Sequence, residues 1–111
     1  MEKATLKDFN DAMMEIYEAG KRLKPPYNAS RFLKMLNEHG GKKTADLLLA
    51  TDNPSDGFTE LFMRGKENLR LCVEYVVLQS RWRELFTPEQ LAIARKRLLD
   101  CECPLPPEET V

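Results

Sequence analysis

The sequence predicts an all-α fold, a single compact bundle of five or six short helices. Apolar residues recur at helical spacing along most of the chain, and strand-like alternation is absent. Helix-start signals precede several segments, and the most specific is Thr87-Pro88-Glu89-Gln90, which fits a capping box with proline at the first helical position. Glycines and prolines separate the segments, as expected where helices end.

Length and composition favour one domain. The chain has 111 residues, of which 42% are hydrophobic and 32% charged, which is typical of a globular core with a solvated surface. We predict one helical domain over residues 1–100, with an N-terminal amphipathic helix over 1–24 and a core over 27–100. Residues 101–111 are acidic and rich in proline, and we expect this tail to be disordered.

The first half of the chain predicts three helices. The first covers about residues 3–24, and its apolar stripe either packs within the chain or forms a dimer seam, so we expect a monomer or a homodimer through this helix. Pro25-Pro26 ends it, and Asn28 is the predicted N-cap of a second helix over about 29–39. Gly40-Gly41 separates this helix from a third over about 42–50.

The second half predicts further short helices. Ser55 is the expected N-cap of the fourth helix, with Asp56 in its first turn and Gly65 at its end. The next helix is predicted over about 67–78, followed by a short helical turn that includes Trp82. The last helix is predicted to run from Pro88 to about Asp100.

The apolar positions of these helices form the predicted core. Burial of each large apolar side chain contributes about 1.5–3 kcal/mol, so no metal or disulfide is required for folding. The predicted core contains Phe9, Met13, Phe32, Leu36, Leu48, Phe58, Leu61, Leu69, Val73, Val76, Leu85, Phe86, Leu91 and Leu98.

A family resemblance extends over about residues 27–99. It rests on five blocks in order: Arg31 to Leu36, Gly40-Gly41, Pro54 to Leu61, Leu69 to Leu78, and Leu85 to Leu98. The third and fifth blocks contain the pattern PSDGFTxL…LFTxEQxxIARxRL. With these blocks the chain resembles a small all-helical domain of uncharacterised bacterial proteins. The resemblance implies a helical fold, and no activity is established for that family.

No group of residues predicts catalysis or a cofactor. His39, the single histidine, precedes Gly40 at a helix end, where a cation is favourable without any chemistry. The three cysteines are an odd number, and Cys101 and Cys103 read as a surface thiol pair prone to oxidation, since two thiols are too few for a zinc site. We therefore expect no enzyme activity, no metal and no cofactor.

A basic segment gives the best functional hint. Trp82 lies between Arg81 and Arg83, and an aromatic ring beside guanidinium groups is typical of protein-contact anchors and of base-stacking sites. The same pattern also fits a core tryptophan whose neighbours extend to solvent. The predicted partner-binding residues are Arg81, Trp82, Arg83, Arg95, Lys96 and Arg97.

Three functional hypotheses follow. The first is a non-enzymatic interaction protein that contacts another protein, such as a small inhibitor or adaptor encoded by a phage or mobile element. The second is nucleic-acid binding through the basic C-terminal helical surface, although the net charge of -1 provides no general attraction to phosphates. This surface comprises Arg64, Lys66, Arg70, Arg81, Arg83, Arg95, Lys96 and Arg97. The third is an unrecognised enzyme. The sequence has no membrane-spanning run and its N-terminus lacks the apolar stretch of a signal peptide, so we expect a cytoplasmic location without membrane partners.

Overall fold

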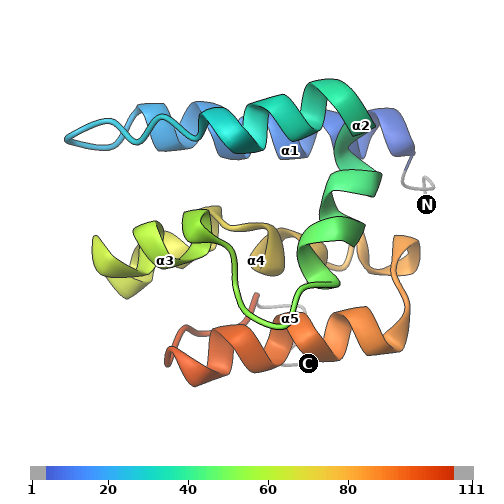
Figure 1. The fold of residues 1–111 in the computed structure, drawn as a ribbon. Helices are drawn as coiled ribbons and strands as arrows, with labels where there is room; N and C mark the ends of the chain where they lie inside the picture. The colour runs from blue at the N-terminus through green and yellow to red at the C-terminus, as the bar shows by residue number, and fades with distance from the viewer. Residues whose placement is uncertain (1–4, 107–111) are drawn as a thin grey trace.

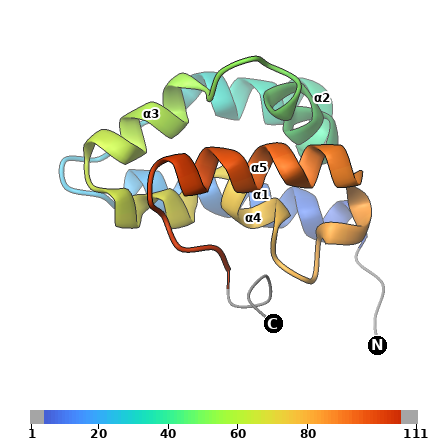
Figure 2. The same cartoon turned by 90° about the horizontal axis from the view of Figure 1, so that it is seen from below.

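The computed structural model describes residues 5–106, and over this range it contains helices and turns but no strand. The predicted all-α fold is confirmed. In Figure 1, α1 (Leu6–Lys21) and the start of α2 (Ser30–Leu49) lie side by side, and α5 (Pro88–Asp100) lies on the opposite side of the molecule. Between them lie α3 (Asp56–Met63) and α4 (Val73–Val77). In Figure 2, seen from below, α5 crosses in front of α1 and α4.

The α1 helix begins at a Thr5 cap, whose hydroxyl accepts a hydrogen bond from the Asp8 backbone N–H at 3.0 Å. It packs chiefly against α2, and Phe9 and Met13 are fully buried. The apolar stripe of the helix is therefore used inside the chain. This packing favours the alternative in which the stripe is used within the chain, although Leu6 at its start is 57% exposed, and a homodimer through the first helix stays a prediction.

The α2 helix is bent where the sequence predicts a break between two helices. Gly40 has φ 79° and ψ 168°, a combination essentially restricted to glycine. The following Gly41 contacts α1, and its N–H donates a hydrogen bond to the Asn10 side chain. The predicted Asn28 cap is wrong. The N-cap of α2 is Ala29, without a side-chain cap, because the Asn28 amide oxygen accepts a hydrogen bond from the Tyr17 hydroxyl at 3.2 Å.

The α3 helix begins and ends as predicted. The Ser55 hydroxyl accepts a hydrogen bond from the Phe58 backbone N–H at 3.1 Å, and Asp56 lies in the first turn. The helix ends before Gly65, which has a φ of 128°. Phe58 and Leu61 point into the core.

The helix predicted over residues 67–78 is wrong as a continuous element. A 3-10 helix, η1 (Lys66–Leu71), is separated from α4 by Cys72, which has extended backbone geometry. The prediction assumed one amphipathic helix with a solvated face. In the structure α4 is central and buried on nearly every side, so the chain turns at Cys72 to bury both Leu69 and Leu78.

The last part of the chain follows the prediction closely. A short 3-10 turn, η2 (Arg83–Leu85), leads into α5, and Trp82 immediately precedes it. The capping box at the start of α5 is complete: the Gln90 N–H donates to the Thr87 hydroxyl at 3.1 Å, and the Thr87 N–H donates to the Gln90 side chain at 3.0 Å.

The tail prediction is wrong for residues 101–106. Cys103 and Pro106 are buried, and the Cys103 N–H donates to the Leu98 carbonyl at 3.0 Å, so the chain turns back onto the end of α5. The burial of Cys103 also contradicts a surface pair with Cys101, which is half-buried. Residues 107–111 of the predicted tail and residues 1–4 of the predicted first helix lie outside the described range.

Most of the predicted core is confirmed. Of the predicted residues, Phe32, Leu48, Leu85 and Leu91 are half-buried and the others are buried. The core also contains residues outside that predicted list. The apolar stripes of their helices already marked Ala45, Leu49, Cys72, Val77 and Ala94, whereas Leu78, Trp82 and Cys103 lie outside those stripes.

Candidate binding cleft

Trp82, the centre of the predicted partner-binding set, lies in the core. Only 4% of its surface is exposed, and its ring packs edge-on against Phe9 with centroids 5.4 Å apart. Arg81 covers the other side, with its guanidinium 4.5 Å from the ring centroid and 3.5 Å from the Asp8 carboxylate. The predicted contact role of the Trp82 ring is therefore wrong, and its alternative as a core residue is confirmed.

Arg97 is also inside the molecule, and its predicted contact with a partner is wrong. The exposed fractions of the Arg97 and Glu74 side chains are 7% and 3%, and the two form an ion pair at 2.9 Å. The Arg97 guanidinium also donates to the Leu48 carbonyl at 3.0 Å and to the Thr51 carbonyl at 2.6 Å. This network joins α4, α5 and the end of α2, because one guanidinium presents several donors in fixed directions.

The remaining predicted residues do not form an open basic patch. Lys96 is exposed, but its ammonium lies 2.8 Å from the Asp100 carboxylate one turn later. Arg83 and Arg95 are half-buried, and each is engaged with another group. The predicted set is therefore divided between core positions and locally paired surface charges.

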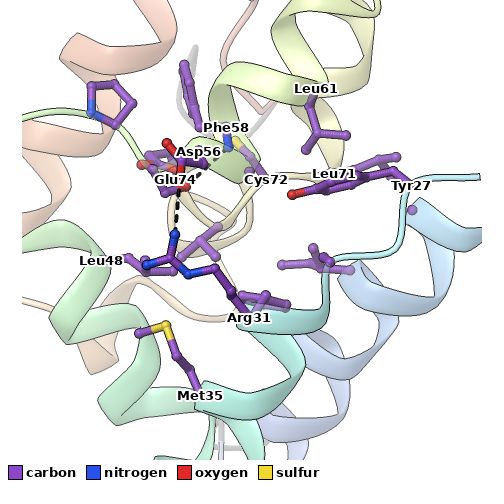
Figure 3. Close-up of a pocket in the computed structure, with 18 of the residues that line it drawn as sticks. Tyr27, Arg31, Met35, Leu48, Asp56, Phe58, Leu61, Leu71, Cys72 and Glu74 are labelled. Atoms are coloured by element: carbon purple, nitrogen blue, oxygen red, sulfur yellow. Dashed lines mark hydrogen bonds and ion pairs between the residues drawn. The ribbon is translucent and has the colours of Figure 1, made fainter.

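A cleft of about 690 Å³ lies between α2 and α3, and we call it the α2–α3 cleft (Figure 3). Its floor is formed by buried apolar residues from α3 and from the turn before α4. Half-buried side chains of α2 form one wall, and Tyr27 and the end of α1 close one side. The lining includes Tyr27, Arg31, Phe32, Met35, Leu47, Leu48, Ser55, Asp56, Phe58, Leu61, Cys72 and Glu74.

Phe32 and Leu48 belong to the wall of this cleft, which explains their place outside the closed core. Both were predicted as core residues because they lie on the apolar faces of their helices. The bend at Gly40 changes the direction of α2 (Figure 1), and Phe32 before the bend and Leu48 after it both line the cleft. Helical periodicity marks an apolar face, but it does not say whether another part of the chain covers it.

An ion pair crosses the mouth of the cleft. The Arg31 guanidinium donates a hydrogen bond to the Asp56 carboxylate at 3.2 Å, as the dashed line in Figure 3 shows. The two side chains are 91% and 93% exposed, so water screens their attraction, and such pairs typically contribute 0–1 kcal/mol. Neither residue belonged to the predicted partner-binding set.

The titratable groups of the cleft are held in neutral or paired forms. Burial raises the pKa of the Cys72 thiol well above its ordinary value, and the neighbouring Glu74 carboxylate raises it further. Burial also raises the pKa of the Tyr27 hydroxyl, assisted by the Glu60 and Asp56 carboxylates. Glu74 reaches the cleft but is neutralised by Arg97. The interior of the cleft is therefore apolar and without net charge.

These groups provide little for catalysis. The Cys72 thiol stays protonated, and a thiol is a far weaker nucleophile than a thiolate. The Ser55 hydroxyl is used to cap α3, and His39 does not line the cleft. Within residues 5–106 no three His, Cys, Asp or Glu side chains are grouped to hold a metal ion.

Comparisons of the chain with protein-family models, curated proteins and solved structures give no match. The family resemblance read from the sequence therefore stays a prediction. In the described part of the chain, no helix has the length and apolar character needed to cross a membrane.

Proposed function

We propose that the protein is a non-enzymatic interaction protein of the cytoplasm that binds an apolar segment of another protein in the α2–α3 cleft. The observation that supports the proposal is the cleft itself: about 690 Å³ of concave space with an apolar lining and few polar groups. Clefts of roughly 300–1,000 Å³ with such linings are typical binding sites. The proposal keeps the class of function predicted from the sequence and moves the contact surface from residues 81–97 to the cleft.

The wall of the cleft supports a binding role. Phe32, Met35 and Leu48 are half-buried, and Leu47 is 37% exposed at the edge. Covering these side chains would remove more apolar surface from water, at about 25 cal/mol per Å². The elements on each side are held by contacts within the chain: the Ser55 hydroxyl caps α3, and the Gly41 N–H of α2 donates to the Asn10 side chain of α1.

The test compares two branched aliphatic side chains that are equally exposed. Leu47 lines the cleft, whereas Ile93 on α5 does not, and each is 37% exposed. We would select binders from a phage library of random 12-residue peptides and measure their dissociation constants by fluorescence anisotropy. Leu47→Asp should weaken the selected peptides at least about tenfold, because a charge is desolvated in an apolar site, and Ile93→Asp should have no effect.

Two results would contradict the proposal. One is a library selection that yields no peptide. The other is a set of peptides that bind the Leu47→Asp variant as well as the original chain, which would place their site elsewhere. Thermal unfolding of both variants provides the control, since each side chain is exposed enough to be replaced without loss of the fold.

Nucleic-acid binding is less favoured than protein binding. Four of its predicted cations, Arg64, Arg81, Lys96 and Arg97, are paired with carboxylates of the chain, and Arg97 is also buried, whereas Lys66 and Arg70 are exposed. The pairs reduce the number of cations available to phosphates. Binding of the chain to a single-stranded oligonucleotide should accordingly be weak. An affinity that is strong at low salt and falls steeply as salt rises would reverse this judgement.

A further inference from the structure

We propose that Arg31 is the specificity residue of the α2–α3 cleft, and that the bound segment is an amphipathic helix of a partner protein with a carboxylate that pairs with Arg31. This inference rests on the proposed function and adds the chemistry of the partner.

Arg31 is the cation at the mouth of the cleft. Its hydrogen bond to Asp56 uses a single nitrogen, Nη1, and a guanidinium carries five N–H donors. The remaining donors can bind a second carboxylate while Asp56 holds the guanidinium over the mouth. The next cation on the same helix face, Lys34, lies outside the cleft and is 3.9 Å from the Glu38 carboxylate.

Asp56 depends less on this pair than Arg31 does. Asp56 lies in the first turn of α3, where an acidic side chain is favoured by the helix dipole. Arg31 lies in the first turn of α2, where the helix dipole disfavours a cation and where α2 itself has no acidic residue. An incoming anion is therefore stabilised at Arg31, whereas an incoming cation would compete with Arg31 for Asp56.

The apolar lining strengthens this preference once the cleft is filled. An apolar face that covers Phe32 and Met35 displaces water from the mouth, and the attraction between Arg31 and a carboxylate increases as the effective dielectric constant falls. The interior adds no competing charge, because Glu74 is paired with Arg97. The apolar contacts thus supply affinity, and Arg31 supplies orientation.

A helix is the backbone form that fits the surroundings. Residues 5–106 contain no strand, so there is no sheet edge on which a partner could add an extended strand. Recognition of polyproline segments uses several aromatic side chains in a row, whereas this cleft presents Tyr27, Phe32 and Phe58 on separate elements. Of the common modes of peptide recognition, this leaves an amphipathic helix that docks between α2 and α3. Its apolar residues, spaced at i, i+3 or i+4, would face the floor of the cleft.

The test uses peptides selected from the random 12-residue library on the original chain. We expect them to share apolar residues at helical spacing with an Asp or Glu. Arg31→Gln should weaken binding about tenfold, which is the scale of one lost charge pair at a partly covered site. Replacing the peptide carboxylate by its amide should cause a similar loss on the original chain and no further loss on Arg31→Gln.

Charge exchange separates this inference from the proposed function. On Arg31→Glu, a peptide with Lys in place of its acidic residue should recover binding that the acidic peptide has lost. The matched control is Lys34→Glu, which makes the same change one turn later on α2 outside the cleft and should leave the dissociation constant within about twofold. Peptides that need Leu47 but tolerate Arg31→Glu would overturn the role of Arg31 and leave the proposed function intact.

Two further measurements test whether a different molecule occupies the cleft. Dodecanoate that binds the original chain and not Leu47→Asp, with no peptide selected, would identify a fatty-acid-like ligand and overturn the helix. A concentration-dependent dimer in analytical ultracentrifugation that Leu47→Asp dissociates would identify a second copy of the chain as the occupant, and would also overturn the inference.

Discussion

Arg97 illustrates at the residue scale how burial changes the role of a charged side chain. On the sequence it is one of three consecutive basic residues near the end of the last helix, where exposed cations are common. In the structure it is buried and bonded to Glu74, Leu48 and Thr51. The sequence offered one signal for this network: Glu74 is a single charge inside the otherwise apolar segment from Cys72 to Leu78.

Loss of the Arg97 side chain should be strongly destabilising. Arg97→Met leaves the Glu74 carboxylate buried without a counter-charge, so we expect the free energy of unfolding to fall by about 3–5 kcal/mol. Urea denaturation followed by circular dichroism measures this. The double variant Glu74→Leu with Arg97→Met should lose less than Arg97→Met alone, since no buried charge then remains unpaired. A loss below 1 kcal/mol for Arg97→Met would show that the network contributes little.

The cysteines should differ in reactivity. At pH 8 we expect Ellman's reagent to react first with half-buried Cys101, whereas buried Cys72 and Cys103 react only through opening of the fold. In denaturant all three thiols should react at once. Equal rates for the three thiols in the folded protein would contradict the burial described here.

The same thiols give stability a pH dependence. Burial raises the pKa of Cys72 and Cys103 above the ordinary 9.0 in the folded state. As pH rises past about 9, the unfolded chain ionises first, so this contribution to stability is full below that pH and is lost above it. The free energy of unfolding should therefore decrease between pH 8 and pH 10, and less steeply in Cys72→Val. If the free energy of unfolding decreases equally steeply with pH in the original chain and in Cys72→Val, Cys72 does not contribute to the pH dependence.

At the scale of elements, α2 shows that one glycine can decide where two helical faces point. The bend at Gly40 places the first part of α2 beside α1 and turns the second part toward α5 (Figure 1). Gly41 is equally constrained by space, because a Cβ there would lie 2.7 Å from the Asn10 side-chain oxygen. The cleft exists because the helix changes direction at this point.

Gly40→Ala tests the bend. A side chain at φ 79° and ψ 168° is strained, and we expect a loss of about 1–3 kcal/mol in the free energy of unfolding. Gly57→Ala is the matched control. Gly57 lies in α3, its added Cβ would be 3.4 Å from the Tyr27 hydroxyl, and alanine favours helix formation, so stability should stay the same or rise. If both substitutions change the free energy of unfolding equally, the backbone conformation at Gly40 does not require glycine.

At the scale of the whole molecule, α1 is part of the core rather than an addition to it. Phe9 contacts both Trp82 and Phe86, at centroid distances of 5.4 and 5.5 Å. These rings connect the beginning of the chain to the segment that precedes α5. The sequence resemblance covers only about residues 27–99, yet the ring that closes this part of the core comes from α1.

Unfolding should therefore be a single transition. The fluorescence of Trp82, the one tryptophan, and the circular dichroism of the helices should change at the same urea concentration. Phe9→Ala should shift both transitions together, by about 3–5 kcal/mol in free energy, because it leaves a cavity against Trp82. A fluorescence change that precedes the loss of helix would mean that α1 separates from the rest of the fold independently.

Local signals explain the parts of the fold that were predicted well. The caps at Ser55 and Thr87, the break at Gly40 and the end of α3 before Gly65 depend on backbone groups within a few residues, which the sequence states directly. Apolar periodicity likewise identified most of the core. The failure at Cys72 arose because periodicity assumes one solvated face, whereas α4 is surrounded by the chain.

The sequence by itself determined the helical class, the helix starts and most apolar faces, because these follow from interactions between near neighbours in the chain. The tertiary structure alone decided that Trp82 and Arg97 are internal, and that Phe32, Arg31 and Asp56 border a cleft. Those assignments depend on contacts between residues far apart in sequence, such as Arg97 with Glu74, and on the direction that α2 takes after Gly40. Periodicity shows which face of each helix is apolar, and only tertiary packing determines which apolar face stays uncovered.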